Sequence, residues 1–563
     1  MPVDLMTKQG QQLLESGKTP WTVYPRPQMK RDSYVNLNGH WEFTVTDGES
    51  LPESYEHTIL VPFCPESQLS GLKFHPEDGK YLCYRRKFTL PEGFRKDRVL
   101  LHVGAADQVA EVYVNQKKLT KHIGGYEAFA VDITDGLTAE NELVIRITDD
   151  LRSTVLPYGK QVLRRGGMWY TPVSGIWQTV WLESVPERYI HKLTIRNRGA
   201  AVTITTEPKL DGVVVVEGLG EFPLTGGYVR IAPENPHFWS PEDPYLYAFT
   251  VTAGEDRVES YFALRTLEIK TVDGVPRLCL NGKPYFFHGL LDQGYWPDGL
   301  FTPASPECYR EDILAMKELG FNTLRKHIKV EPEEFYYQCD KLGMVVFQDM
   351  VNNGDYSFIR DTALPTVGIQ KLDDRRLHRD PTSRKAFLDG MQATVEQLYN
   401  HPSICYWTIF NEGWGQFDSD RVYEMLRQLD DTRFIDTTSG WFRRKKTDVD
   451  SRHVYFKKVK LKAGEKPLVL SEFGGYSYKP EGHVFNTEQT YGYGKCATQA
   501  ELERAVEKLY LEQVVPAYRQ GLCAAIYTQV SDIEDETNGL LSYDRKVTKV
   551  SKDKMLAIAE LLK

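Results

Sequence analysis

The segment Ile404-Cys-Tyr-Trp-Thr-Ile-Phe-Asn411-Glu412-Gly413 places a glutamate directly after a mostly apolar run. The segment Leu468-Val-Leu-Ser-Glu472-Phe-Gly-Gly475 repeats this pattern further along the chain. Each run is short and bounded by polar residues and glycine, which indicates a strand buried on both faces. In β/α barrels, side chains at the carboxyl ends of such strands line the mouth of the barrel. The two glutamates are therefore expected at that mouth.

Strand and helix patterns alternate from residue 271 to residue 563. The expected strands are Phe286–Gly289, Asn322–Lys326, Val345–Asp349, Ile404–Phe410, Phe434–Thr438, His453–Phe456, Leu468–Ser471 and Ala524–Thr528. The expected helices are Cys308–Leu319, Glu333–Leu342, Arg384–Tyr399, Ser419–Leu429 and Leu502–Arg519. Eight strands with interleaved helices predict a (β/α)8 barrel, in which Glu412 follows the fourth strand and Glu472 ends the seventh.

The first half of the chain is rich in strands and poor in helices. In residues 1–187, segments such as Trp41–Val45 and Glu142–Ile147 alternate apolar and polar residues between turn signals, which predicts a jelly-roll-like β-sandwich. Residues 188–270 repeat this alternation in Lys192–Arg196 and Tyr247–Val251 and are long enough for one immunoglobulin-like sandwich. The expected fold class is therefore multidomain β plus α/β, with boundaries after residues 187 and 270.

Composition excludes several classes of protein. The net charge of −9, with mixed signs and no basic stripe, argues against nucleic-acid binding. The 8 cysteines lack a C-x-x-C pair and most lie in apolar contexts, which predicts reduced thiols in a cytoplasmic protein. We find no apolar run long enough to span a membrane and no signal-peptide pattern at the N-terminus. Phosphate loops, metal-ligand clusters and cofactor fingerprints are also absent from the sequence, so we expect no cofactor and no metal.

Two carboxylates facing each other at a barrel mouth point to a particular chemistry. They are the minimal apparatus of glycoside hydrolysis, with one acting as proton donor and the other as nucleophile or base. Aromatic residues make up 12% of the chain, which suits surfaces that stack on sugar rings and suits large sandwich cores equally well. The alternative is that Glu412 and Glu472 are ordinary strand-end acids in solvent.

Further segments carry a resemblance to a known family. They are Leu37–Phe43, Ile176–Glu183 and Tyr261–Arg265 in the sandwiches, and Leu280–Pro284, Gly320–Arg325, Asn400–Ser403 and Asn411-Glu412 in the barrel. In this order and spacing they resemble the family 2 glycoside hydrolases, which include β-galactosidases, β-glucuronidases and β-mannosidases. The resemblance covers nearly the whole chain.

The resemblance implies an exo-acting, retaining β-glycosidase with Glu412 as general acid/base and Glu472 as nucleophile. Such a pair requires carboxyl groups about 5–5.5 Å apart. Arg325 is the candidate for keeping Glu472 ionised, and Tyr455 for donating a hydrogen bond to it. The alternative for Arg325 is a surface guanidinium, and for Tyr455 a packed aromatic edge.

Other candidates for sugar contacts follow the barrel strands. His453 is placed to contact the sugar, unless it too is a packed aromatic edge, and Asn411 is suited to the 2-hydroxyl, where a hydrogen bond tightens in the transition state. Loops at the same face supply acids, amides and rings: Asp292, Tyr295, Trp296, Asp298, Asp349, Trp441, Tyr527, Gln529, Glu534 and Glu536. Such a mixture suits recognition of a neutral sugar, but an ordinary barrel rim contains it as well.

Departures from the family bear on the substrate. The Asn-x-Lys of glucuronidases is not visible, because Asn538 is followed by Gly539 and Leu540. The run Arg443-Arg-Lys-Lys446 could pair with a sugar carboxylate instead, although a solvated loop is the favoured interpretation. The segment Arg325-Lys-His-Ile-Lys-Val330 also differs from the Arg-x-Ser-His-Tyr-Pro of many relatives.

The sequence thus favours hydrolysis of terminal β-galactosides. The alternatives are a β-glucuronidase or β-galacturonidase acting on acidic sugars, and a carbohydrate-binding scaffold without activity. The expected partner is a carbohydrate, neither nucleic acid nor membrane, and a homo-oligomer is compatible with the sequence.

Overall fold

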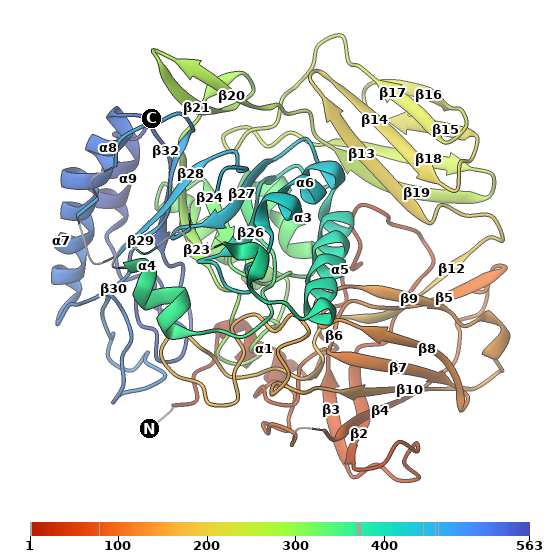
Figure 1. The fold of residues 1–563 in the computed structure, drawn as a ribbon. Coiled ribbons are helices and arrows are strands. Elements are labelled where there is room, and N and C mark those ends of the chain that lie inside the picture. The colour runs from red at the N-terminus through yellow and green to blue at the C-terminus, as the bar shows by residue number, and fades with distance from the viewer. Residues whose placement is uncertain are drawn as a thin grey trace.

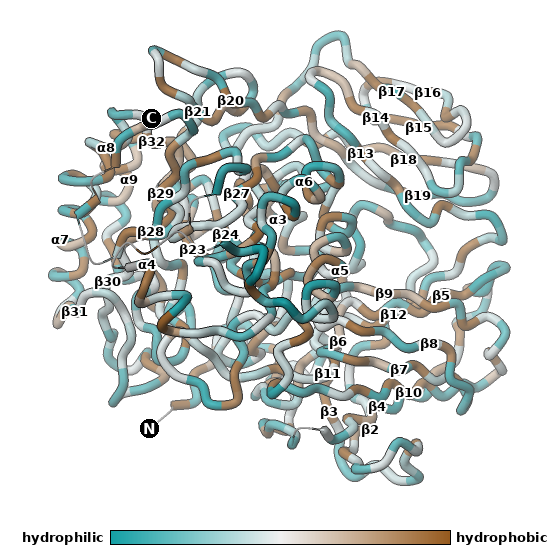
Figure 2. Tube along the Cα trace, in the orientation of Figure 1, coloured by the Kyte–Doolittle hydropathy of each residue, from teal (hydrophilic) through white to brown (hydrophobic). Residues whose placement is uncertain are grey.

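The computed structural model describes residues 3–77, 79–366, 369, 373–442, 444–455, 458–459 and 461–563. Figure 1 shows two β-sandwiches on one flank of a barrel and the C-terminal helices on the opposite flank. In Figure 2, hydrophobic segments occur in both sandwiches and in the barrel, so each has an apolar interior of its own. The fold class predicted from the sequence is confirmed. No helix in the described part of the chain has the length and apolar character needed to cross a bilayer.

The first sandwich follows a short helix, α1 (Lys8–Ser16). Its strands alternate as predicted, since Trp41 and Phe43 of β2 are buried while His40 and Glu42 are exposed. One sheet has the order β1 (Tyr34–Asn36), β12 (Val180–Val185), β5 (Arg98–Val103), β9 (Phe129–Asp132), and the other β3 (His57–Val61), β2 (Gly39–Thr46), β4 (Tyr81–Phe88), β10 (Asn141–Thr148), β7 (Val109–Val114), β8 (Lys117–Ile123). β6 (Ala106–Asp107) pairs with β11 (Gly175–Ile176), and η1 (Thr134–Gly136) is a single turn.

The second sandwich packs two smaller antiparallel sheets around Val202, Val214 and Phe249. One has the order β13 (Lys192–Arg198), β14 (Ala201–Glu207), β17 (Tyr228–Ile231), and the other β16 (Gly220–Leu224), β15 (Gly212–Val216), β18 (Tyr247–Ala253), β19 (Asp256–Phe262). A separate sheet of β20 (Leu267–Val272), β21 (Val275–Leu280) and β22 (Lys283–Pro284) spans the expected boundary at residue 270.

The C-terminal half forms a barrel of eight parallel strands, and every strand predicted from the sequence is present. The sixth was predicted too late, because only Ser451 and His453 of its five residues are fully buried and an apolar run is lacking. The predicted end, Phe456, lies outside the described residues. The strand order is β27 (Phe434–Ser439), β26 (Ile404–Asn411), β25 (Val345–Asp349), β24 (Thr323–Lys326), β23 (Phe287–Asp292), β32 (Leu522–Thr528), β29 (Leu468–Gly474), β28 (Asp450–Val454). The hydroxyls of Ser439 and Ser451, 3.3 Å apart, join the first and last of these strands.

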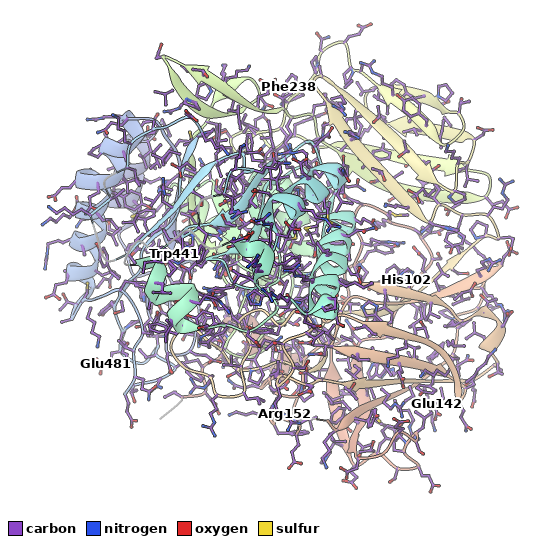
Figure 3. The ribbon with its side chains drawn as sticks, in the orientation of Figure 1. His102, Glu142, Arg152, Phe238, Trp441 and Glu481 are labelled. Atoms are coloured by element: carbon purple, nitrogen blue, oxygen red, sulfur yellow. The ribbon has the colours of Figure 1, made fainter. Side chains whose placement is uncertain are left out.

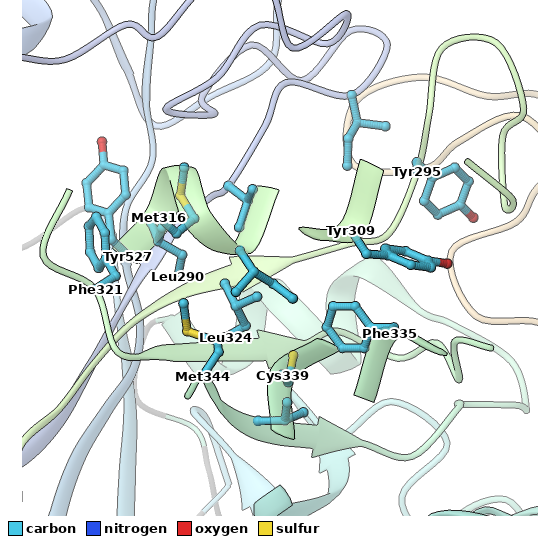
Figure 4. Close-up of a cluster of buried hydrophobic side chains, with 14 of the residues drawn as sticks. Leu290, Tyr295, Tyr309, Met316, Phe321, Leu324, Phe335, Cys339, Met344 and Tyr527 are labelled. Carbon is cyan, nitrogen blue, oxygen red and sulfur yellow. The ribbon is translucent and has the colours of Figure 1, made fainter. Parts of the chain in front are cut away.

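Helices cover the outside of the barrel, so its strands are buried on both faces. Figure 4 shows part of this layer, with Leu290 and Leu324 of the strands beside Met316 and Phe335 of the helices. The predicted helix Leu502–Arg519 is three consecutive pieces, and Pro516, which lacks an N–H, lies in the first turn of the last one, where that N–H is not needed. The helices are α2 (Glu307–Glu318), α3 (Glu333–Leu342), η2 (Phe358–Ala363), α4 (Leu364–Thr366), η3 (Asp374–Arg376), α5 (Pro381–Leu398), α6 (Ser419–Leu429), α7 (Gln499–Leu509), η4 (Tyr510–Val514), α8 (Val515–Arg519) and α9 (Lys552–Glu560), and a small strand pair is β30 (Tyr476–Ser477) and β31 (Gly494–Lys495).

One connection of the first sandwich lies against the barrel. We call residues 149–174, between β10 and β11, the bridging loop. The Tyr158 hydroxyl donates to the Gly354 carbonyl at 2.9 Å, beyond β25. The Thr171 N–H donates to both carboxylate oxygens of Glu534 at 3.2 Å, beyond β32. The bridging loop therefore contacts loops that follow two different barrel strands.

Candidate active site

Two glutamates from separate strands meet at the C-terminal end of the barrel. Glu412 directly follows β26, Glu472 lies on β29, and both side chains are buried. His453 of β28 lies between them, with Nδ1 2.9 Å from Glu412 Oε1 and 3.5 Å from Glu472 Oε2. The ring nitrogen and one oxygen of each carboxylate all lie within 4.8 Å of one another. The structure thus brings together the acids that the strand ends predicted to face each other.

Arg325 of β24 is fully enclosed by this group, so its interpretation as a surface guanidinium is wrong. Its Nη1 donates to Glu472 Oε1 at 3.1 Å and to the Ser471 carbonyl at 3.0 Å. Its Nε donates to Asp349 Oδ1 at 3.0 Å, and Nη2 to Asn411 Oδ1 at 2.9 Å. One guanidinium therefore orients side chains from three other strands, β25, β26 and β29. Asn411 turns its side-chain carbonyl toward Arg325. Its NH2 group therefore points away from Arg325 and can donate to a ligand.

Glu472 is held in its charged form. The Tyr455 hydroxyl donates to Glu472 Oε2 at 2.5 Å and lies 2.9 Å from Thr528 Oγ1. Burial alone raises the pKa of this carboxyl, but His453, Arg325 and the Tyr455 hydrogen bond outweigh burial and keep the pKa below its usual value.

Glu412 is oriented by its backbone and by His453. Its φ of 51° lies in the left-handed region, which is uncommon outside glycine. Its N–H donates to the Ser439 carbonyl at 3.0 Å, while His453 Nε2 lies 3.1 Å from the Ser439 hydroxyl. The ring of Trp441 meets His453 edge-on at 5.7 Å between centroids, and Figure 3 shows Trp441 on the barrel side of the molecule. Trp441 is thus brought to the site with His453 and Tyr455.

Tyr527 is not brought to the site, contrary to the sequence prediction. Its ring packs against Phe473 and Tyr510, outside the barrel wall, and its hydroxyl accepts from the Tyr476 N–H at 3.4 Å. Figure 4 labels it in the apolar cluster that also contains Leu290. Side chains of a strand alternate between its faces, so the next residue, Thr528, points inward instead.

Asp292 and Glu534 are also engaged elsewhere. Asp292 Oδ2 accepts from Lys326 Nζ at 2.7 Å, and Lys326 in turn donates to the buried Glu331 at 2.9 Å. Glu534 is bound by the bridging loop at Thr171 and carries no contact to the paired glutamates. Asp292 thus joins the ends of β23 and β24, and Glu534 fixes the bridging loop to the loop after β32.

Two cations of the basic run after the fifth strand are held by acids. Arg444 lies 3.2 Å from Asp374 and 3.4 Å from Asp420, and Lys446 lies 2.6 Å from Glu424. Arg443 lies outside the described residues. Arg444 and Lys446 are therefore paired with acids on or near α6, and Lys445 is exposed.

Sequence reasoning missed His327, which lies two residues beyond Arg325 in the segment that departs from the family pattern. Its Nδ1 is 2.9 Å from Asp349 Oδ2 and 4.0 Å from Glu472 Oε1. Burial lowers the pKa of His327, and the hydrogen bond to Asp349 opposes that effect. The sequence signal was available, since His327 follows Arg325 at the period of two that a strand gives its inward side chains.

Aromatic residues of the bridging loop were missed as well. The rings of Trp169 and Trp414 stack at 5.2 Å, and Tyr356 meets both edge-on. The hydroxyl of Tyr170 donates to Glu536. These contacts join the first sandwich to the loops after β25, β26 and β32. They could not be predicted, because the residues involved follow no periodic pattern in the sequence.

Glu412, His453 and Glu472 also form a set whose spacing could hold a metal ion. The fit is poor, because the Arg325 guanidinium and the Tyr455 hydroxyl already donate to the two oxygens of Glu472. A cation there would also face the charge of Arg325. The donor set suits a hydrogen-bonded acid pair better.

Family models match three parts of the chain. "Glycosyl hydrolases family 2, TIM barrel domain" matches residues 272–548, and "Glycosyl hydrolase 2 galactose-binding domain-like" matches residues 72–157. "Glycosyl hydrolases family 2" matches residues 191–265. The matched parts lie in the barrel, the first sandwich and the second sandwich.

Curated relatives include a β-glucuronidase of Felis catus, 25% identical over 69% of this chain and 65% of the relative. A putative β-glucuronidase of Formosa agariphila is 25% identical over 73% of this chain and 50% of the relative. A β-galactosidase of Thermoanaerobacter pseudethanolicus is 24% identical over 89% of this chain and 68% of the relative. The chain thus spans less than two thirds of the length of the first two.

Solved structures share the fold over almost the entire chain. The β-D-glucuronidase of Dictyoglomus thermophilum has a TM-score of 0.73 at 19% identity, and the match covers 95% of this chain and 98% of that one. A β-galacturonidase of Eisenbergiella tayi, bound to galacturonate, has a TM-score of 0.67 at 19% identity, covering 96% of this chain and 98% of that one. With the family models matched in order and two buried glutamates meeting at the barrel mouth, this chain belongs to family 2 of the glycoside hydrolases.

Proposed function

We propose that this chain is an exo-acting, retaining β-glycosidase that releases a terminal uronic acid. The observation that carries the proposal is the buried pair Glu412 and Glu472, with carboxylate oxygens within 4.8 Å and His453 between them. Retaining enzymes hold the two carboxyl groups about 5–5.5 Å apart, whereas inverting enzymes leave about 6.5–9.5 Å for a water molecule. The short separation supports retention.

Two displacements follow from this geometry. Glu472, kept ionised by Arg325 and Tyr455, attacks the anomeric carbon while Glu412 donates a proton to the leaving oxygen. Glu412 then removes a proton from the water that releases the sugar from Glu472. The amide of Asn411, oriented by Arg325, is placed to donate to a sugar hydroxyl in both steps. Trp169 of the bridging loop stacks on Trp414, two residues after Glu412, which supports binding of one terminal sugar.

Tyr455→Phe tests how Glu472 is kept ionised. The variant loses a hydrogen bond to a charged group, and we expect kcat/KM to fall by about tenfold or more. The pKa of Glu472 should rise, because the lost hydrogen bond favoured its charged form. The acidic limb of the kcat/KM profile should therefore move to higher pH. Tyr527→Phe is the matched control, since that hydroxyl lies outside the barrel, and an unmoved limb in Tyr455→Phe would contradict the role of Tyr455.

The choice of an acidic sugar differs from the preference that the sequence alone gave. The relatives and solved structures reported above are named β-glucuronidase or β-galacturonidase more often than β-galactosidase. These names favour the uronide alternative over neutral β-galactosides. A scaffold without activity is disfavoured, because both glutamates remain paired and hydrogen-bonded.

A panel of nitrophenyl β-glycosides tests the sugar class. We expect kcat/KM for the β-glucuronide or the β-galacturonide to exceed that for the β-glucoside and β-galactoside by at least about tenfold, ~1.4 kcal/mol in transition-state binding. Each pair of sugars differs only at C6, so leaving-group chemistry cancels. A preference for the neutral β-galactoside would restore the β-galactosidase interpretation of the sequence. If none of the sugars is turned over, the result would favour a carbohydrate-binding scaffold without activity.

A further inference from the structure

A lysine of the bridging loop carries a buried charge without an ionic partner. Lys160 is 6% exposed. Within the described part of the chain, no carboxylate oxygen lies within 4.0 Å of its Nζ. The ammonium lies over the rings of Trp414 and Tyr170, 5.3 Å and 5.7 Å from their centroids. Rings stabilise a cation only in part, and burying an unpaired charge is costly, so this ammonium is poised to receive an anion.

Other buried cations around the site are already neutralised. Arg325 is paired with Asp349 and Glu472, Lys326 with Asp292 and Glu331, Lys329 with Glu331, and Lys549 with Asp532. Arg165, on the same loop as Lys160, is paired with Glu534 and Asp535. Each of these cations has a carboxylate within 4.0 Å, whereas Lys160 has none among the described residues.

The ammonium lies beside residues that neighbour the reacting pair. Trp414, under Lys160, follows Glu412 by two residues on the same loop. Burial lowers the pKa of His327, and the charge of Lys160 adds to that effect. His327 in turn lies 4.0 Å from Glu472. The charge thus sits within reach of both the Glu412 loop and the surroundings of Glu472.

The neighbouring acid Glu536 already has two hydrogen-bond donors of its own. Glu536 accepts from the Tyr170 hydroxyl and, at 3.2 Å, from the Asn538 amide. Burial raises the pKa of Glu536, and the charge of Lys160 acts against that rise. No ion pair within 4.0 Å joins Glu536 to Lys160 among the described residues.

We propose that Lys160 Nζ binds the carboxylate of the terminal uronic acid, so that the first sandwich supplies the residue that selects an acidic sugar. The inference rests on the proposed function and names its specificity determinant. The carboxylate would complete the ammonium's contacts by a charge-assisted hydrogen bond, which is stronger than a neutral one. A neutral sugar would leave the charge without its partner.

The test compares Lys160→Met with Lys160→Arg and with Arg164→Gln. Methionine keeps the apolar length against Trp414 and removes the charge. For Lys160→Met we expect kcat/KM on the nitrophenyl uronide to fall about a hundredfold, with the value on the matched neutral sugar changed less than about threefold. Lys160→Arg should keep most of the preference. Arg164→Gln removes an exposed charge from the same loop and should change neither value.

Two outcomes separate this inference from the proposed function. A native enzyme that prefers uronides, together with an equal preference in Lys160→Met, overturns the role of Lys160 alone. A native enzyme that hydrolyses neither uronide contradicts the sugar class and the inference together. Thermal unfolding of each variant shows whether the fold is intact, and binding of free glucuronate and galacturonate, weakened only in Lys160→Met, gives a readout that does not depend on turnover.

Discussion

Replacing Glu472 by alanine is expected to lower kcat/KM by at least about 10⁵-fold, ~7 kcal/mol in the activation barrier. The variant has no atom that can attack the anomeric carbon, and Arg325 loses the charge that it orients. Adding azide should restore part of the rate, because a small anion can enter the space of the missing carboxylate. The product should then be the glycosyl azide of inverted configuration, which NMR identifies.

Glu481→Ala provides the matched control for Glu472→Ala. Glu481 is exposed, and Figure 3 labels it away from Trp441, so its loss should leave kcat/KM unchanged. A Glu472 variant that keeps substantial turnover would remove the proposed nucleophile. An azide product of retained configuration would assign that variant the acid/base role instead.

Replacing Glu412 by alanine is expected to give an effect that depends on the leaving group. For alkyl glycosides, whose leaving oxygen must be protonated, kcat/KM should fall by about 10⁴-fold, ~5 kcal/mol. For dinitrophenyl glycosides the loss should be far smaller, since a good leaving group departs without a proton.

Azide again separates the two roles. In Glu412→Ala it should accelerate turnover and give the glycosyl azide of retained configuration, because it attacks the intermediate from the side that Glu412 occupied. An equal loss on alkyl and dinitrophenyl substrates would contradict general acid catalysis by Glu412. Exchanged responses of the two variants would reverse the assignment.

The sequence predicted the parts of the site that depend on strand ends. Short apolar runs, each ending in a polar residue, located Arg325, Asn411, Glu412 and Glu472, and these four side chains meet in the structure. A parallel barrel brings the carboxyl ends of its strands to one face, so position along each strand was enough. The sixth strand was misplaced because its residues alternate in burial instead of forming an apolar run.

The choice between adjacent residues needed the tertiary structure. Tyr527 was predicted at the site, but Thr528 points inward, since a shift of one residue moves a side chain to the other face of a strand. Asp292 was predicted in the loop after the first strand, yet it ends β23 and is bound to Lys326, a pairing that the sequence does not reveal.

By itself the sequence determined the barrel, the two sandwiches and the strand-end carboxylates, because hydrophobic period is a local property of the chain. Only the tertiary structure decided what surrounds those carboxylates. Lys160 reaches the site from a different domain, through an irregular loop with no period to mark its direction. The partners of each buried charge are fixed by contacts between segments far apart in sequence, and those partners decide which cations remain free for a substrate.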